Sequence, residues 1–236
     1  MSNVTTREGR PDLPMQGVPQ PGREQVLNLP RVHISQHPVM VHKMTALRNK
    51  HTPPPQFYRL VKEIGSLLAY EATAQLDLVE KVIETPLESM TGYKLAGGIG
   101  ITPILRAGLG LAEGFREVLH DVQIWHLGLR RDEHTLQAME YYNRMPHNVD
   151  FQICYVVDPM LATGGSAIDT VNILKEKGVR RISYACIIAA PYGLLKLRQA
   201  HPDIDIYIAA LDERLNDYGF IVPGLGDAGD RQFGTF

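Results

Sequence analysis

The chain has 236 residues and a mass of 26.4 kDa, which fits one large domain or one domain with an appendage. Its hydrophobic fraction of 44%, charged fraction of 21% and formal net charge of -2 are typical of a soluble globular protein and give no positive field that would gather nucleic acid. No apolar run is long enough to cross a bilayer, and no apolar leader follows the N-terminal charges. We therefore expect no nucleic-acid partner, no membrane partner and a cytoplasmic location.

The first segment, residues 1–32, is rich in Pro, Gly, Gln and Arg, and its prolines interrupt any helical or strand period. We interpret it as a disordered or loosely docked extension, with the folded domain in residues 33–236. Apolar residues at helical spacing predict an amphipathic helix over residues 57–73. Cys154 and Cys186 each lie inside an apolar run, which favours small buried thiols over a disulfide or metal ligands.

The middle of the chain alternates short apolar runs with helical patterns, which is typical of an α/β fold. The runs predict strands over residues 99–105, 122–127, 152–157, 182–190 and 204–209, and the helical patterns cover residues 109–119, 166–177 and 194–200. This alternation predicts a parallel sheet covered on both faces, with right-handed crossovers. Such sheets bind ligands beyond the carboxyl ends of their strands, so functional residues are expected directly after these runs.

The most informative segment follows the third predicted strand, where Asp158 precedes Thr163, Gly164, Gly165 and Ser166 and a helix begins. Glycines let backbone N–H groups turn toward a phosphate, and a helix start adds unpaired donors and a positive dipole end. The spacing excludes a Walker A loop and a dinucleotide fingerprint. An acid before such a loop indicates a sugar phosphate, with Asp158 on ribose hydroxyls. An ordinary strand-turn-helix capped by Ser166 is the alternative, and it explains only the serine.

Three other segments carry candidate chemistry. Arg106 lies at a glycine-containing turn after the first predicted strand, where its guanidinium would meet a pyrophosphate, unless it is simply a solvated surface residue. Residues 127–146 are polar and indicate a mobile arm, or a hairpin without function. Residues 224–229 match G-x-G-x-x-G but leave no room for the helix and distal acid of a dinucleotide site, so they favour a backbone-lined pocket for a planar base over a floppy tail. The N-terminal histidines lack metal-ligand spacing; they are His33, His37, His42 and His51.

These segments resemble the uracil phosphoribosyltransferases, a branch of the type I phosphoribosyltransferases. The resemblance covers residues 37–236 and rests on the runs VHKMTALR, EIGSLLAYEATAQL, ILRAGLG, VVDPMLATGGS and VPGLGDAGD. Most of the superfamily has two adjacent acids in the phosphate loop, whereas Asp158 is followed by Pro159, which is the pattern of the uracil branch. The resemblance implies the type I fold, with a mainly parallel five-stranded sheet, flanking helices and a small hood built from N- and C-terminal segments.

The implied reaction joins uracil to 5-phosphoribosyl 1-diphosphate (PRPP) and releases UMP and diphosphate, with Mg²⁺ brought by the substrate's phosphates. The resemblance also implies a homodimer or homotetramer and allows GTP as an effector. Another pyrimidine or purine phosphoribosyltransferase is one alternative. A catalytically weak or regulatory, nucleotide-sensing relative is the other, because the arm departs from the family pattern at Arg130, His134, Ala138 and Glu140.

By position, the resemblance implies roles for individual residues. Catalytic roles fall to Arg106, Arg131, Asp158 and Asp227. PRPP is expected to contact Arg106, Arg131, Asp158, Pro159, Met160, Leu161, Ala162, Thr163, Gly164, Gly165, Ser166 and Asp227. Uracil is expected to contact Ile221, Gly226, Asp227 and Ala228. The protein alone is expected to hold no metal, although Asp227 could reach Mg²⁺ through water.

Overall fold

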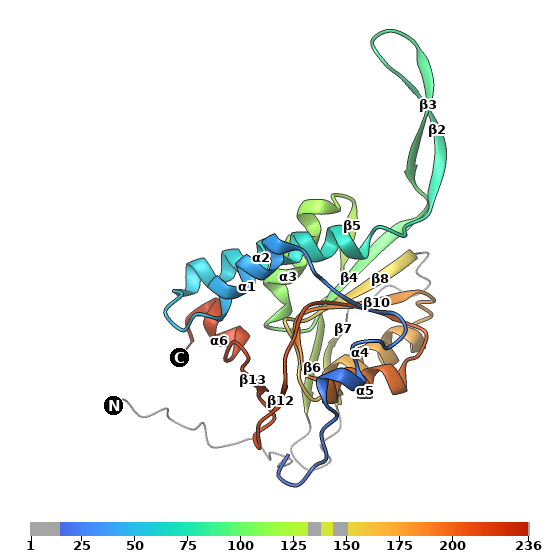
Figure 1. Cartoon of the computed structure of the whole chain (residues 1–236). Helices are drawn as coiled ribbons and strands as arrows, with labels where there is room; N and C mark the ends of the chain where they lie inside the picture. Colours follow the sequence, from blue (N-terminus) through green and yellow to red (C-terminus); the bar gives the residue numbers. More distant parts are fainter. Residues whose placement is uncertain (1–14, 132–137, 144–150, 236) are drawn as a thin grey trace.

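The structure, a computed structural model, describes residues 15–131, 138–143 and 151–235. At its centre is a seven-stranded sheet whose neighbouring strands run parallel, with helices on both faces (Figure 1). The strand order is β1-β11-β10-β8-β4-β5, and β9 pairs with β10. The strands are β1 (Val32–Ile34), β4 (Gly98–Pro103), β5 (Val122–Ile124), β8 (Phe151–Val157), β9 (Met160–Leu161), β10 (Ile182–Ala189) and β11 (Asp205–Leu211).

The predicted α/β class, a mainly parallel sheet with flanking helices, is confirmed. The five predicted apolar runs correspond to β4, β5, β8, β10 and β11. The expected number of five strands is corrected to seven, because β1 and β9 also join the sheet. With three and two residues, these strands are too short to show a hydrophobic period in the sequence.

The helices form one layer on each face of the sheet. Alternate residues of a pleated strand face opposite layers, so on β8 Tyr155 and Val157 pack toward one layer while Cys154 and Val156 pack toward the other. The first layer contains α1 (Pro38–Arg48), α2 (Pro54–Ala72), α3 (Gly108–Val118) and α6 (Ala228–Phe233), and the second contains α4 (Gly165–Glu176) and α5 (Pro191–Ala200). Within the described ranges, no helix is long and apolar enough to span a bilayer.

Proline and local capping set where several helices begin. Pro54 opens α2 and Pro191 opens α5, because the missing N–H of proline costs nothing in the first turn. Pro38 opens α1, and the ring of His37 caps that helix by accepting a hydrogen bond from the backbone N–H of Val39 at 3.1 Å. His37 therefore has a structural partner in its own helix.

The second half of the N-terminal extension packs against the domain. Met15 is 7% exposed and Val26 is fully buried. The side-chain amide of Gln20 donates to the carbonyl of Leu215 at 3.0 Å and accepts from the N–H of Leu215 at 2.8 Å. A short 3-10 helix, η1 (Arg23–Gln25), lies in this segment. Residues 15–31 are thus docked on the folded domain, and residues 1–14 lie outside the described residues.

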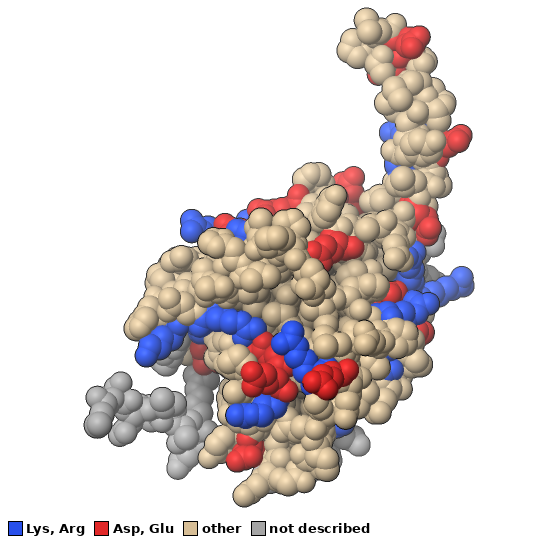
Figure 2. Space-filling model, viewed as in Figure 1, with Lys and Arg blue, Asp and Glu red and all other residues tan. Residues whose placement is uncertain are grey.

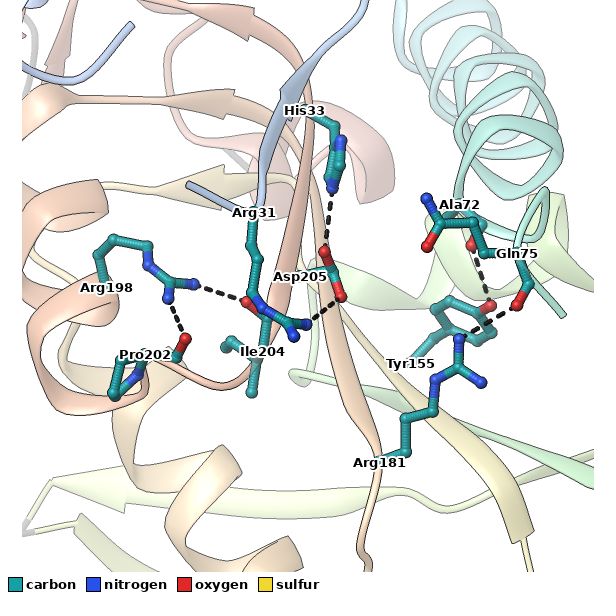
Figure 3. Close-up of polar contacts among 10 residues, drawn as sticks. All are labelled: Arg31, His33, Ala72, Gln75, Tyr155, Arg181, Arg198, Pro202, Ile204 and Asp205. Atoms are coloured by element: carbon teal, nitrogen blue, oxygen red, sulfur yellow. Dashed lines mark hydrogen bonds and ion pairs between the residues drawn. The ribbon is translucent and has the colours of Figure 1, made fainter. Parts of the chain in front are cut away.

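The edge strand β1 is held to the sheet by polar contacts, which Figure 3 shows. Asp205 accepts from Nη1 of Arg31 at 3.0 Å and lies 3.0 Å from Nε2 of His33. The ring of His33 also stacks on Tyr207, with 4.5 Å between centroids. These contacts explain how a three-residue edge strand is held in place.

A long hairpin projects from the body of the molecule (Figure 1). It consists of β2 (Leu78–Glu84) and β3 (Ser89–Leu95), which pair in antiparallel register. Nearly every residue of both strands is exposed, so neither face of the hairpin has a core to pack on. The exposed apolar side chains are Leu78, Val79, Val82, Ile83, Leu87, Met90, Tyr93 and Leu95.

A second antiparallel pair lies where the sequence predicts a polar arm. It consists of β6 (Leu127–Arg131) and β7 (Ala138–Asn143), with Arg131 opposite Ala138. Residues 132–137 and 144–146 of the predicted arm lie outside the described residues. The structure gives the backbone register of Arg131, and the predicted contact of its side chain with the diphosphate stays a prediction.

Candidate functional site

The sequence-predicted segments meet at one edge of the sheet, beyond the carboxyl ends of its strands. Asp158 follows β8 and is held to β10 by a hydrogen bond from its N–H to the carbonyl of Ala185 at 3.1 Å. The turn after β4 is held to β8 in the same way, from the N–H of Ile104 to the carbonyl of Val157 at 3.0 Å. A parallel sheet therefore brings the two turns side by side, although they are far apart in the sequence.

The phosphate loop, residues 158–166, borders a cavity of about 90 Å³. Gly164 adopts a left-handed conformation, with φ at +84°, and turns the chain directly into α4. The cavity is lined by Asp158, Met160, Leu161, Ala162, Thr163, Gly164, Gly165, Ser166, Ala167 and Tyr184. Every loop residue expected to bind PRPP is among them except Pro159, which lies buried and accepts backbone N–H groups of β10.

Asp158 is half-buried at this cavity. Burial raises the pKa of its carboxyl group to about 7, and a 3.4 Å hydrogen bond from the N–H of Met160 opposes the rise. A carboxylate in such surroundings is poorly solvated, and hydroxyl donors on a ligand would stabilise its charge. The side chain is thus suited to accept hydrogen bonds from a sugar.

The loop rests on the first turn of α5. A Cβ atom placed on Gly193 would lie 2.1 Å from the carbonyl oxygen of Ala162 and 3.1 Å from the nitrogen of Gly164. Two backbones therefore touch here, and no side chain fits between them. The sequence prediction misses Gly193, although a glycine two residues into a helix opened by Pro191 is the kind of signal that marks close backbone packing.

Arg106 lies at the turn between β4 and α3, and its guanidinium points to the C-terminal segment. Its Nη2 donates to Oδ1 of Asp230 at 3.0 Å, and the guanidinium carbon lies 5.5 Å from the ring centroid of Phe233. Half of the side chain is exposed. The predicted pyrophosphate residue and the predicted base segment are therefore neighbours.

The C-terminal segment, whose glycine density favours a backbone-lined pocket, ends in the short helix α6. Asp227 caps α6, since its Oδ1 accepts from the N–H of Asp230 at 2.9 Å. Ile221 and Ala228 are buried, Asp227 is half-buried and Gly226 is exposed in a left-handed conformation. A Cβ on Gly219 of the same segment would lie 3.6 Å from Cγ2 of Thr163, so this segment approaches the phosphate loop.

Two arginines that the sequence reasoning misses fix this segment. Arg48 pairs with Asp212, which is 3% exposed, and donates to the carbonyl of Gly224 at 2.8 Å, while the N–H of Gly224 donates to Asp212 at 2.8 Å. Arg231 donates to three carbonyls and covers an aromatic ring at 4.3 Å; its partners are Leu47, Asn49, Leu225 and Phe57. Most of these contacts join residues over a hundred positions apart, which no local pattern reveals.

The remaining site predictions concern metals. Among the residues that the structure describes, no group of three His, Cys, Asp or Glu side chains is placed to hold a metal ion. Cys154 and Cys186 are buried free thiols, and burial raises the pKa of Cys154 to about 12.

An acid-glycine-hydroxyl loop at the carboxyl edge of a parallel sheet defines an α/β protein built to hold a sugar phosphate. The family model described as "Uracil phosphoribosyltransferase" matches residues 34–235. Curated proteins of that name from Roseiflexus castenholzii and Macrococcus caseolyticus are 53% and 50% identical, and the matches cover 87% of this chain and 99% of each relative. The solved structure of the AQ2163 protein from Aquifex aeolicus superposes with a TM-score of 0.80 at 35% identity, over 86% of this chain and 97% of that one. The chain belongs to the uracil phosphoribosyltransferase family.

Proposed function

We propose that the chain transfers the 5-phosphoribosyl group of PRPP to N1 of uracil, giving UMP and diphosphate. The observation that carries the proposal is the cavity at Asp158 and the Thr163–Ser166 loop, with a glycine-rich C-terminal segment beside it. Membership of the family supports uracil as the base. The reaction belongs to pyrimidine salvage.

The proposed mechanism depends mainly on positioning and on charge. Backbone N–H groups and hydroxyls of the loop hold the 5-phosphate, and Asp158 accepts hydrogen bonds from the ribose hydroxyls. As N1 of uracil forms a bond to C1 of the ribose, the bond from C1 to the diphosphate oxygen breaks and the diphosphate leaves with the electron pair. The proton of N1 passes to the carboxylate of Asp227, the acidic side chain assigned to the base. Arg106 and Arg131 stabilise the departing charge. Holding both reactants in line lowers the entropic part of the barrier.

The base is assigned to Ile221, Gly226, Asp227 and Ala228. Buried apolar contacts from Ile221 and Ala228 suit the faces of a pyrimidine, and the backbone groups around Gly226 can pair with its polar edges. Asp227 is half-buried at the first turn of α6 and offers carboxylate oxygens, the ligand type that Mg²⁺ takes directly or through water. When bound with PRPP, Mg²⁺ would supply positive charge to the diphosphate.

A steady-state assay of uracil-dependent diphosphate release tests this proposal. We expect UMP formation with uracil, none above background with hypoxanthine, guanine, adenine or orotate, and loss of activity when EDTA removes Mg²⁺. Adding GTP in a parallel series tests it as an effector. Tight nucleotide binding without UMP formation would favour the regulatory alternative instead.

We also infer that the chain forms a homodimer or larger homo-oligomer through the β2–β3 hairpin. An isolated two-stranded hairpin is marginally stable in water, and this one exposes apolar side chains on both faces. Figure 2 shows that its surface is largely uncharged, with a few acidic and basic side chains. Such a mixed patch can complement its own copy across a two-fold axis.

Replacing both Val82 and Tyr93 by Glu should break this assembly, because the exposed fractions of these side chains are 73% and 66% and a charge there would be buried in the interface. Size-exclusion chromatography with light scattering should find a dimer or larger species for the parent and a monomer for the variant. Lys94→Gln on the same hairpin serves as the control and should leave the assembly intact. A monomeric parent, or an unchanged assembly in the double variant, would contradict the inference.

A further inference from the structure

The phosphate-loop cavity contains a side chain for which the proposed mechanism has no role. Tyr184 lies in β10, in register with Val156 of β8, and is fully buried. It lines the same cavity as Asp158. Its hydroxyl has no hydrogen-bond partner within the part of the chain that the structure describes.

A buried hydroxyl without a partner is rare, because it has lost its bonds to water and gained none in return. Phenylalanine would fill nearly the same volume of the core without this cost. The phenol of Tyr184 is therefore explained best by a partner that it gains in another state of the protein, such as the complex with substrate.

The surroundings of the hydroxyl indicate which partner that is. Tyr184 packs on the α4 side of the sheet, together with Val156 and Ala167, so its ring lies beneath the phosphate loop. Burial raises the pKa of Tyr184, and the nearby charge of Asp158 raises it further. The pKa of the Cys186 thiol is raised by the same two causes. The phenol of Tyr184 and the thiol of Cys186 therefore stay protonated near neutral pH. The phenol can donate a hydrogen bond, and the carboxylate of Asp158 can accept one.

We propose that Tyr184 is a positioning residue for Asp158, whose carboxylate accepts a hydrogen bond from the phenol, directly or through one water, while it holds the ribose. A carboxylate has acceptor sites for both partners, and a polar cavity of about 90 Å³ has room for a bridging water. This inference rests on the proposed function, which places the ribose on Asp158. It adds a donor that fixes the direction of the carboxylate and stabilises its charge.

Tyr184→Phe tests the proposal because it removes a single oxygen atom. The variant should keep its fold, with an unchanged or higher melting temperature, since the lost hydroxyl has no partner in the free protein. We expect kcat/KM for PRPP to fall about tenfold, the size of a lost hydrogen bond to a charged group. The acidic limb of the pH–rate profile should move to higher pH, because a carboxylate that loses a donor binds its proton more tightly.

Tyr155→Phe is the matched control. Tyr155 is also fully buried in the same sheet, but it packs toward the α2–α3 layer, and its hydroxyl donates to the carbonyl of Ala72 at 3.1 Å (Figure 3). This variant loses a hydrogen bond within the core, so its melting temperature should fall by roughly 2–4 °C for each kcal/mol of lost stability. Its kinetics with PRPP and its pH profile should match those of the parent.

Combining Tyr184→Phe with Asp158→Asn separates this inference from the proposed function. If the phenol acts through Asp158, the double variant should be no slower than Asp158→Asn alone. An unchanged kcat/KM and pH profile in Tyr184→Phe, with Asp158→Asn strongly impaired, would overturn the role of Tyr184 alone. Near-normal rates in Asp158→Asn would overturn the ribose contact itself, and the inference with it.

Discussion

Asp158→Asn should lower kcat/KM for UMP synthesis by well over tenfold, which corresponds to more than about 1.4 kcal/mol in the activation barrier. The carboxylate of Asp158 lies at the phosphate-loop cavity, where it can accept two ribose hydroxyl hydrogens and stabilise positive charge on the sugar. An amide offers one acceptor oxygen and no charge. Steady-state kinetics with varied PRPP at saturating uracil and Mg²⁺ measures the loss.

The stability of this variant should show that the loss is chemical. Since burial raises the pKa of Asp158 to about 7 in the folded protein, well above its ordinary value, the native state binds more protons than the unfolded state between these two values. The contribution of Asp158 to stability is therefore lost as pH rises through about 7. Asp158→Asn should be at least as stable as the parent at pH 8, with a smaller difference near pH 4.

Asp121→Asn, at an exposed position, is the control and should leave the rate unchanged. A near-parental rate in Asp158→Asn would remove its assigned role.

Gly193→Ala should disrupt the phosphate loop, although it replaces no residue that lines the cavity. The new Cβ would lie 2.1 Å from the carbonyl oxygen of Ala162, and since that atom belongs to the backbone, the loop itself must move. Overpacking of this kind typically costs about 1–3 kcal/mol of stability. Because the proposed function assigns the phosphate donors to this backbone, we expect KM for PRPP to rise at least about tenfold.

Thermal unfolding and PRPP titration kinetics check the two effects of Gly193→Ala together. Gly22→Ala is a suitable control, because no atom lies within 4 Å of the position of the added Cβ and its φ of -69° suits any residue. That variant should match the parent in both measurements. An unchanged KM and melting temperature in Gly193→Ala would mean that the close contact between α5 and the loop has no functional consequence.

The central fold could be predicted because its signals are local. Apolar runs such as those of β8 and β10 are buried on both faces, and the helices between them show a clear period. The β2–β3 hairpin gave no such signal, because its strands have no buried face to alternate with an exposed one. The sequence left open whether residues 15–31 dock, because the contacts that hold them join distant residues such as Gln20 and Leu215.

The candidate site divides in the same way. Asp158 and the Thr163–Ser166 loop lie within one strand-turn-helix unit, so their chemistry can be inferred from consecutive residues. The partners that hold and tune the site come from elsewhere in the chain. Asp212 follows β11, Gly193 lies in the first turn of α5 and Tyr184 belongs to β10. Each meets the site through packing that the sequence alone does not specify.

The ion pair between Arg106 and Asp230 gives the proposed diphosphate residue an acidic partner within its own chain. If diphosphate binds Arg106 as proposed, it would compete with that carboxylate, because both are anions that can pair with the same guanidinium. Asp230 lies in α6, so the ion pair links the β4–α3 turn to the C-terminal segment. Each time Arg106 exchanged Asp230 for diphosphate, this link would be lost, and it would form again when the diphosphate left. Binding of the activated sugar and the rigidity of the C-terminal segment would then be thermodynamically linked. In the empty enzyme, the carboxylate of Asp230 occupies the guanidinium that the diphosphate would otherwise bind.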